Sequence, residues 1–98
     1  MQKIKTDLTD QIALVTGSGR GIGRAIAKTI ASDGATVLVN DVDEKKANEV
    51  AQEIEKNGGS ARPLAADITG EEEISSLVEE NLQAFDERID ILVNNAGI

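Results

Sequence analysis

Several reactive side chains are absent from this sequence of 98 residues, which contains no cysteine, no histidine, no tyrosine and no tryptophan. The absence of cysteine excludes a disulfide framework and any metal site built on thiolates. The absence of histidine removes the commonest general base and metal ligand. We therefore predict no metal site in this chain.

Long apolar runs are also missing. No uncharged run approaches the length that crosses a membrane, and the start, Met1 to Asp7, lacks the apolar core of a signal peptide. We expect a cytoplasmic protein with no membrane partner. A chain of this length forms one small domain with a single core, which buries roughly two-thirds of the unfolded surface.

Positive charge is scarce, and the formal net charge is −8. Residues 1–40 hold five basic and three acidic side chains, whereas residues 41–98 hold five basic and fifteen acidic ones. This balance argues against nucleic acid as a partner. Three of the basic residues, Arg20, Arg24 and Lys28, lie in or just after a glycine-rich stretch, where they suit an anionic ligand. Solvated helix faces explain the acidic excess equally well.

The glycine-rich stretch is the most informative part of the sequence. After Thr16 it consists of Gly17, Ser18, Gly19, Arg20, Gly21, Ile22 and Gly23. It follows the apolar run 12–15 and leads into apolar residues at helical spacing, so it predicts a strand, a turn and a helix. Such a turn directs backbone N–H groups and the positive end of a helix dipole at one spot, which suits a phosphate or pyrophosphate. A turn with no ligand is the alternative.

The spacing of the glycines narrows the choice of ligand. Gly17, Gly21 and Gly23 follow a Gly-x-x-x-Gly-x-Gly pattern, which is neither the Gly-x-Gly-x-x-Gly fingerprint nor a P-loop. A P-loop places Lys and then Ser or Thr after its last glycine, where this chain has Arg24 and Ala25. The pattern therefore argues against magnesium nucleotide chemistry.

Strands and helices alternate along the rest of the chain. Pro63 lies in the third predicted strand and favours the edge of a sheet, because proline has no N–H to donate. Asp43 is a plausible helix N-cap, and Asn57-Gly58-Gly59 ends that helix. We predict strands over about 11–15, 36–40, 61–65 and 89–93, and helices over about 21–32, 44–56 and 69–85.

This alternation predicts an α/β fold with a parallel sheet. Right-handed crossovers, with a change of direction after the third strand, give the order 3-2-1-4 with helices on both faces. The carboxyl ends of the first and fourth strands then flank a crevice, and open sheets of this kind place their ligands in such a crevice. The glycine-rich stretch and the segment 94–97 both border it.

Asp41 ends the second predicted strand, where an acidic side chain can accept hydrogen bonds from adenosine ribose hydroxyls. A carboxylate at that point repels a 2′-phosphate, so it favours NAD over NADP. A simple turn residue is the alternative for Asp41.

The glycine-rich stretch, Asp41, the pair Asp67-Ile68 and the segment Asn94-Asn95-Ala96-Gly97 together resemble the short-chain dehydrogenase/reductase family. The resemblance implies a Rossmann-like fold and hydride transfer between a nicotinamide cofactor and an alcohol or ketone. It also implies that the 67–68 pair contacts adenine, and that 94–97 supports the central strand and the nicotinamide-side ribose. An Asx-turn and a polar strand end are the respective alternatives. The candidate cofactor-binding residues are Gly17, Ser18, Gly19, Arg20, Gly21, Ile22, Gly23, Asp41, Asp67, Ile68, Asn94, Asn95, Ala96 and Gly97.

Arg20 is the kind of residue that reaches a 2′-phosphate in this family, which would favour NADP, or it is a solvated loop side chain. We predict NAD, because the Asp41 carboxylate must be neutralised before a phosphate fits, whereas Arg20 can turn away at little cost.

The family's catalytic groups are what this chain lacks. The resemblance places a Tyr-x-x-x-Lys pair, a Ser and an Asn beyond the 94–97 segment, and no residue here is predicted to be catalytic. We therefore interpret residues 1–98 as a single, partial NAD(P)-binding Rossmann domain, truncated after the fourth strand. The alternative is a catalytically inactive dinucleotide-binding or interaction module. We also expect a homo-oligomer, formed through the exposed fourth strand or the uncovered sheet face.

Overall fold

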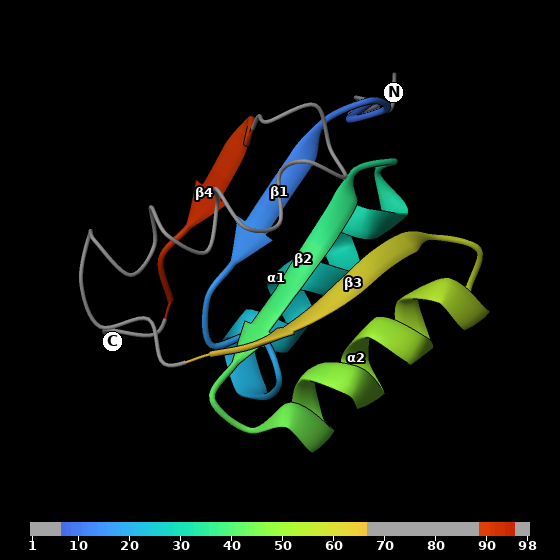
Figure 1. Cartoon of the computed structure of the whole chain (residues 1–98). Coiled ribbons are helices and arrows are strands. Elements are labelled where there is room, and N and C mark those ends of the chain that lie inside the picture. Colours follow the sequence, from blue (N-terminus) through green and yellow to red (C-terminus); the bar gives the residue numbers. More distant parts are fainter. Residues whose placement is uncertain (1–6, 67–88, 96–98) are drawn as a thin grey trace.

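The computed structural model describes residues 7–66 and 89–95 (Figure 1). The elements follow the predicted alternation closely. Along the chain they are β1 (Ile12–Val15), α1 (Gly21–Ser32), β2 (Thr36–Asp41), α2 (Glu44–Lys56), β3 (Ser60–Ala65) and β4 (Ile91–Val93). The helix predicted over 69–85 lies outside the described residues.

The four strands form one sheet in the order β3-β2-β1-β4, and every pair is parallel (Figure 1). This arrangement confirms the predicted topology. In the register of the sheet, Val15 of β1 faces Val39 of β2 on one side and Val93 of β4 on the other. The carboxyl ends of these three strands therefore lie at the same edge of the sheet.

Pro63 lies in β3, which is an outer strand of the sheet, as predicted. It pairs with Val39 of β2, and its outer side faces no strand of this sheet. A proline is tolerated there because no hydrogen bond is required on that side.

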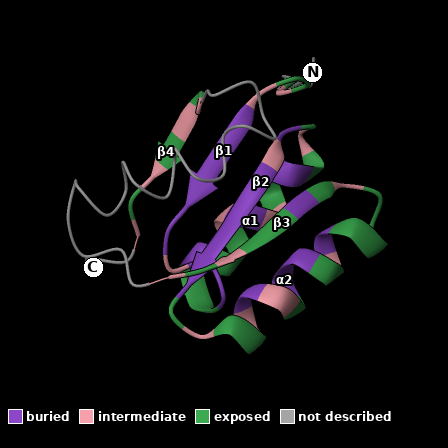
Figure 2. Ribbon diagram, viewed as in Figure 1, coloured by how far each residue is buried: buried purple, intermediate pink, exposed green. Residues whose placement is uncertain are grey.

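The core lies between the sheet and both described helices. Val37 and Val39 of β2 form one buried cluster with Ala27 of α1 and with Val50 and Ile54 of α2, so α1 and α2 cover the same face. β1 and β2 are almost entirely buried, whereas β3 is largely exposed and β4 is half-buried (Figure 2). Coverage of the second face is a prediction that depends on the segment 69–85, outside the described residues.

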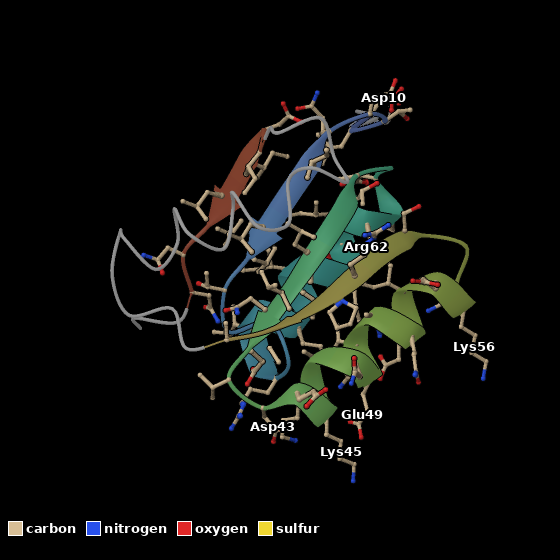
Figure 3. All side chains as sticks on the ribbon, viewed as in Figure 1. Asp10, Asp43, Lys45, Glu49, Lys56 and Arg62 are labelled. Carbon is tan, nitrogen blue, oxygen red and sulfur yellow. The ribbon has the colours of Figure 1, made fainter. Side chains whose placement is uncertain are left out.

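α2 begins with a side-chain cap, as predicted. The Asp43 carboxylate accepts from the backbone N–H of Lys45 at 3.0 Å and of Lys46 at 3.3 Å (Figure 3). The helix ends at Lys56, and Gly58 has a positive φ of 90°, which is typical of glycine just past a helix end. Among the described residues, no helix is both long and apolar enough to span a bilayer.

Candidate functional site

Buried polar side chains concentrate at one edge of the sheet. Within residues 7–66 and 89–95, the buried polar or charged residues are Thr16, Ser18, Asn40 and Asp41. All four lie at or just after the carboxyl ends of β1 and β2. Burial of polar groups costs free energy unless they are hydrogen-bonded, so their concentration at one edge marks a specialised region.

The loop from Gly17 to Arg20 depends on glycine for its conformation. Gly17 and the first helical residue, Gly21, have φ values of 61° and 57°, in the left-handed region that glycine adopts without strain. Gly19 is needed for a different reason. A Cβ at Gly19 would lie 2.6 Å from Asp41 Oδ2 and 2.9 Å from Lys46 Cβ, so a side chain there would push the loop away from the end of β2.

The start of α1 has no side-chain cap. Arg20 occupies the N-cap position in an extended conformation, makes no capping hydrogen bond, and no acidic residue follows in the first turn. The next side chain, Ile22, is 73% exposed. The first N–H groups of a helix have no partner within the helix and carry a partial positive charge, so this end of α1 can receive an anion.

Asp41 is the charged member of these four buried residues, and its side chain is 4% exposed. The carboxylate accepts hydrogen bonds from Gly19 N at 3.1 Å, from Asp43 N at 3.0 Å and from Arg20 Nη2 at 3.3 Å. Burial by itself raises the pKa of Asp41, but the bonds from Asp43, Arg20 and Gly19 together outweigh it and hold the pKa below 3.8. Asp41 is therefore a carboxylate at neutral pH.

Arg20 and Asp41 form an ion pair at 3.3 Å. From the sequence, the first residue favours NADP and the second favours NAD. The Arg20 side chain is 60% exposed, so the pair lies at the mouth of the site and not within the core. Arg20 is therefore engaged with Asp41 and is not a freely solvated loop side chain.

The end of β4 is tied to the glycine loop through Thr16. Its hydroxyl donates to Asn94 Oδ1 at 3.2 Å and accepts from Asn95 N at 2.9 Å. The Asn95 side chain donates to Gly17 O at 3.3 Å, and a Cβ at Gly23 would meet both Gly17 O and this amide. The structure thus brings the glycine loop, the end of β2 and the end of β4 together.

Two residues of this network were not among the sequence-predicted site residues. Thr16 directly follows β1, and Asn40 follows the apolar run Val37–Val39 near the end of β2. A polar side chain directly after a buried apolar run is the signal that could have identified both. Ser18 was predicted, but its hydroxyl is buried and donates to Val15 O at 2.7 Å and Asn40 O at 3.2 Å. Its side chain therefore holds the loop in place.

Four predicted site residues, Asp67, Ile68, Ala96 and Gly97, lie outside the described residues. In the parts of the chain that the structure describes, no group of three acidic side chains is placed to hold a metal ion.

Comparison with models of known protein families identifies the family of this chain. The model of the short chain dehydrogenase family matches residues 11–98, which include every site segment described above. The chain belongs to this family.

The relatives of this chain are considerably longer than the chain itself. It is 44% identical over 90 residues to the 7alpha-hydroxysteroid dehydrogenase of Escherichia coli K12, and the match covers 92% of this chain but 35% of the relative. A structure of a 7alpha-hydroxysteroid dehydrogenase with NADH and 7-oxo glycochenodeoxycholic acid matches with a TM-score of 0.83 and 41% identity, over 92% of this chain and 35% of the other. A metagenomic short-chain oxidoreductase in complex with NADP matches with the same TM-score and identity, over 92% of this chain and 40% of the other.

Proposed function

We propose that this chain binds a nicotinamide dinucleotide across the carboxyl ends of β1, β2 and β4. We further propose that it is part of an oxidoreductase that transfers hydride between that cofactor and an alcohol or ketone. The observation that carries the proposal is the uncapped start of α1 next to the charged carboxylate of Asp41. These two features match the two ends of a nucleotide, because one attracts phosphate and the other accepts from hydroxyl groups.

The residues of the site fit such a ligand. The first-turn N–H groups of α1, including those of Gly21 and Ile22, would receive the pyrophosphate. Glycine at position 19 lets the loop backbone lie close to Asp41, because no side chain stands between the loop and that residue. Asp41 would accept from the ribose hydroxyls of the adenosine half. When bound, the cofactor supplies the hydride-transferring ring, and the residues of this chain hold and orient it.

NAD is the cofactor that we propose, in preference to NADP. A 2′-phosphate would bring further negative charge to the buried Asp41 carboxylate. The charge of Arg20 is already shared with Asp41 through the bond from its Nη2. Because solved relatives carry NADH in one case and NADP in another, the family alone does not decide between them.

The chemical step requires groups that these 98 residues do not include. Hydride transfer at a carbonyl needs a proton donor within hydrogen-bond reach, and the chain has neither tyrosine nor histidine to supply one. We therefore propose residues 1–98 as the dinucleotide-binding part of such an enzyme. The second candidate is a module that binds a dinucleotide without turnover. The lack of tyrosine and histidine favours this candidate for residues 1–98 taken alone.

A cofactor titration tests the proposal. The purified chain is titrated with NADH and separately with NADPH, and binding is followed by the fluorescence of the nicotinamide ring. We expect saturable binding that favours NADH, and a weaker preference in Asp41→Ala because the carboxylate is lost. Glu55→Ala, on the exposed surface of α2, is the matched control and should bind as the wild-type chain does. If the wild-type chain bound neither NADH nor NADPH, the result would contradict the proposal.

Self-association through β4 is a further part of this proposal. β4 is an outer strand of the sheet, and its Leu92 side chain is 52% exposed. An exposed apolar edge strand pairs readily with another chain. Sedimentation equilibrium at micromolar concentration should therefore detect dimers, and a monomer throughout the range would contradict this. The cytoplasmic location expected from the sequence stays a prediction.

A further inference from the structure

Asn40 is a buried polar residue whose placement the proposed function does not explain. It is the penultimate residue of β2, is 2% exposed, and follows the apolar run Val37–Val39. Its Nδ2 donates to Leu64 O at 2.9 Å and to Ala66 O at 3.1 Å. A buried primary amide is costly unless its donors are bonded, so this side chain is specifically accommodated.

The side chain of Asn40 fixes the exit from β3. That strand ends at Ala65, and the next residue donates its N–H to Asp41 O at 3.1 Å. The carbonyl of the same residue, Ala66, accepts from Asn40 Nδ2. Both peptide groups of Ala66 are therefore held against the end of β2 at the point where the chain leaves the sheet.

The backbone of Asn40 fixes the glycine loop from the other side. Its carbonyl accepts from Ser18 N at 2.7 Å and from Ser18 Oγ at 3.2 Å. The next residue in the loop, Gly19, donates its N–H to Asp41 Oδ2. A shift of Ser18 would therefore move a donor of the Asp41 carboxylate.

We propose that Asn40 is a positioning residue for the adenosine half of the dinucleotide site. Its backbone holds the glycine loop, which donates to the Asp41 carboxylate, and its side chain holds the exit from β3, which donates to the Asp41 backbone carbonyl. The inference rests on the proposed function, in which Asp41 receives the ribose. Asn94 and Asn95 bond to Thr16 and Gly17 instead, so we expect Asn40 to act first on the adenosine half.

Two substitutions remove the Nδ2 donor in different ways. Asn40→Leu keeps a similar volume without polar atoms, and Asn40→Ala removes the side chain beyond Cβ without adding charge. Asn48→Leu, on α2, is the matched control. For each variant, urea denaturation first identifies conditions in which the chain is folded, and NADH and NADPH affinities are then measured under those conditions.

We expect both Asn40 variants to lose preference for NADH over NADPH by roughly tenfold, which corresponds to the loss of one or two hydrogen bonds to buried acceptors. The control should keep the wild-type preference. Equal weakening of both affinities would show a structural role alone and overturn the inference, as would an unchanged preference. If the wild-type chain binds neither nucleotide, the proposed function fails as well, so the two failures are distinguished by the wild-type titration.

A measurement on the wild-type chain keeps the inference testable if the variants do not fold. The side-chain amide protons of Asn40 can be followed by NMR during titration with AMP and, separately, with nicotinamide mononucleotide. We expect slow exchange with water and a shift on addition of AMP, with no shift on addition of nicotinamide mononucleotide. Rapid exchange, or no response to AMP, would overturn the inference.

Discussion

The two described helices begin in opposite ways. α2 begins at Asp43, whose carboxylate accepts from two N–H groups of the first turn, and an acidic residue, Glu44, follows. α1 begins at Arg20, with no side-chain cap and no acidic residue in its first turn. Every helix start has the same unpaired donors and the same positive dipole. In α2 the Asp43 side chain accepts from two of these donors, whereas in α1 no side chain caps them.

Asp41 lies between these two helix starts and interacts with both. It accepts from Gly19 and Arg20, which precede α1, and from Asp43, which precedes α2. The starts of α1 and α2 are therefore neighbours that share the Asp41 carboxylate. Substitutions at each start can test separately whether it contributes to stability or to dinucleotide binding.

Gly23→Ala should have the largest effect, because its Cβ would meet Gly17 O and lie 2.6 Å from Asn95 Nδ2. Overpacking of this kind costs about 1–3 kcal/mol of stability. We also expect dinucleotide binding to be lost, since the loop must move away from the first turn of α1. Urea denaturation and NADH titration measure the two effects.

The control for that variant is Gly58→Ala. Gly58 has a φ of 90° and open space around it, at the far end of α2. Alanine there costs about 1–2 kcal/mol through backbone strain alone. We expect lower stability with unchanged NADH affinity. Loss of affinity in Gly58→Ala would mean that general destabilisation, and not the loop, explains the first result.

Asp43→Ala should have an intermediate effect, confined to stability. Loss of an N-cap costs about 0.5–2 kcal/mol, and Asp43→Asn should restore most of it because asparagine caps equally well. The backbone N–H that Asp43 donates to Asp41 is retained in both variants. We expect a lower urea midpoint with NADH affinity preserved. A parallel fall in affinity would show that the two helix starts are not independent.

The smallest effect concerns acid stability. The pKa of Asp41 is raised by burial but lowered more by its hydrogen bonds, so in the folded chain it lies below the ordinary 3.8. The carboxylate therefore contributes stability that is complete above 3.8 and is lost as the pH falls through the folded pKa. In Asp41→Asn, the urea midpoint should fall less steeply below pH 3.8 than in the wild-type chain. An identical pH profile would contradict this assignment.

The sequence was sufficient to predict the elements, because apolar runs, glycines and the cap at Asp43 are local signals, and the handedness of the crossovers then predicted the order of the sheet. It also predicted that the glycine loop and Asp41 belong to one site, and the structure brings them into contact. It could not show that Arg20 pairs with Asp41, or that Asn40 bonds to the exit from β3, because those partners lie 21 to 26 residues apart. Such contacts depend on how loops and strands that are distant in the sequence meet in the fold, which a local residue pattern does not specify.

Pro63 has a consequence for how copies of this chain can combine. The β3 edge lacks one N–H, and that edge is further blunted by the exposed Arg62, whereas β4 has neither feature. A sheet that can be extended at one edge only cannot grow indefinitely. Two copies joined through their β4 edges would form a closed pair, with a proline-bearing strand at each outer border, and not an open fibre.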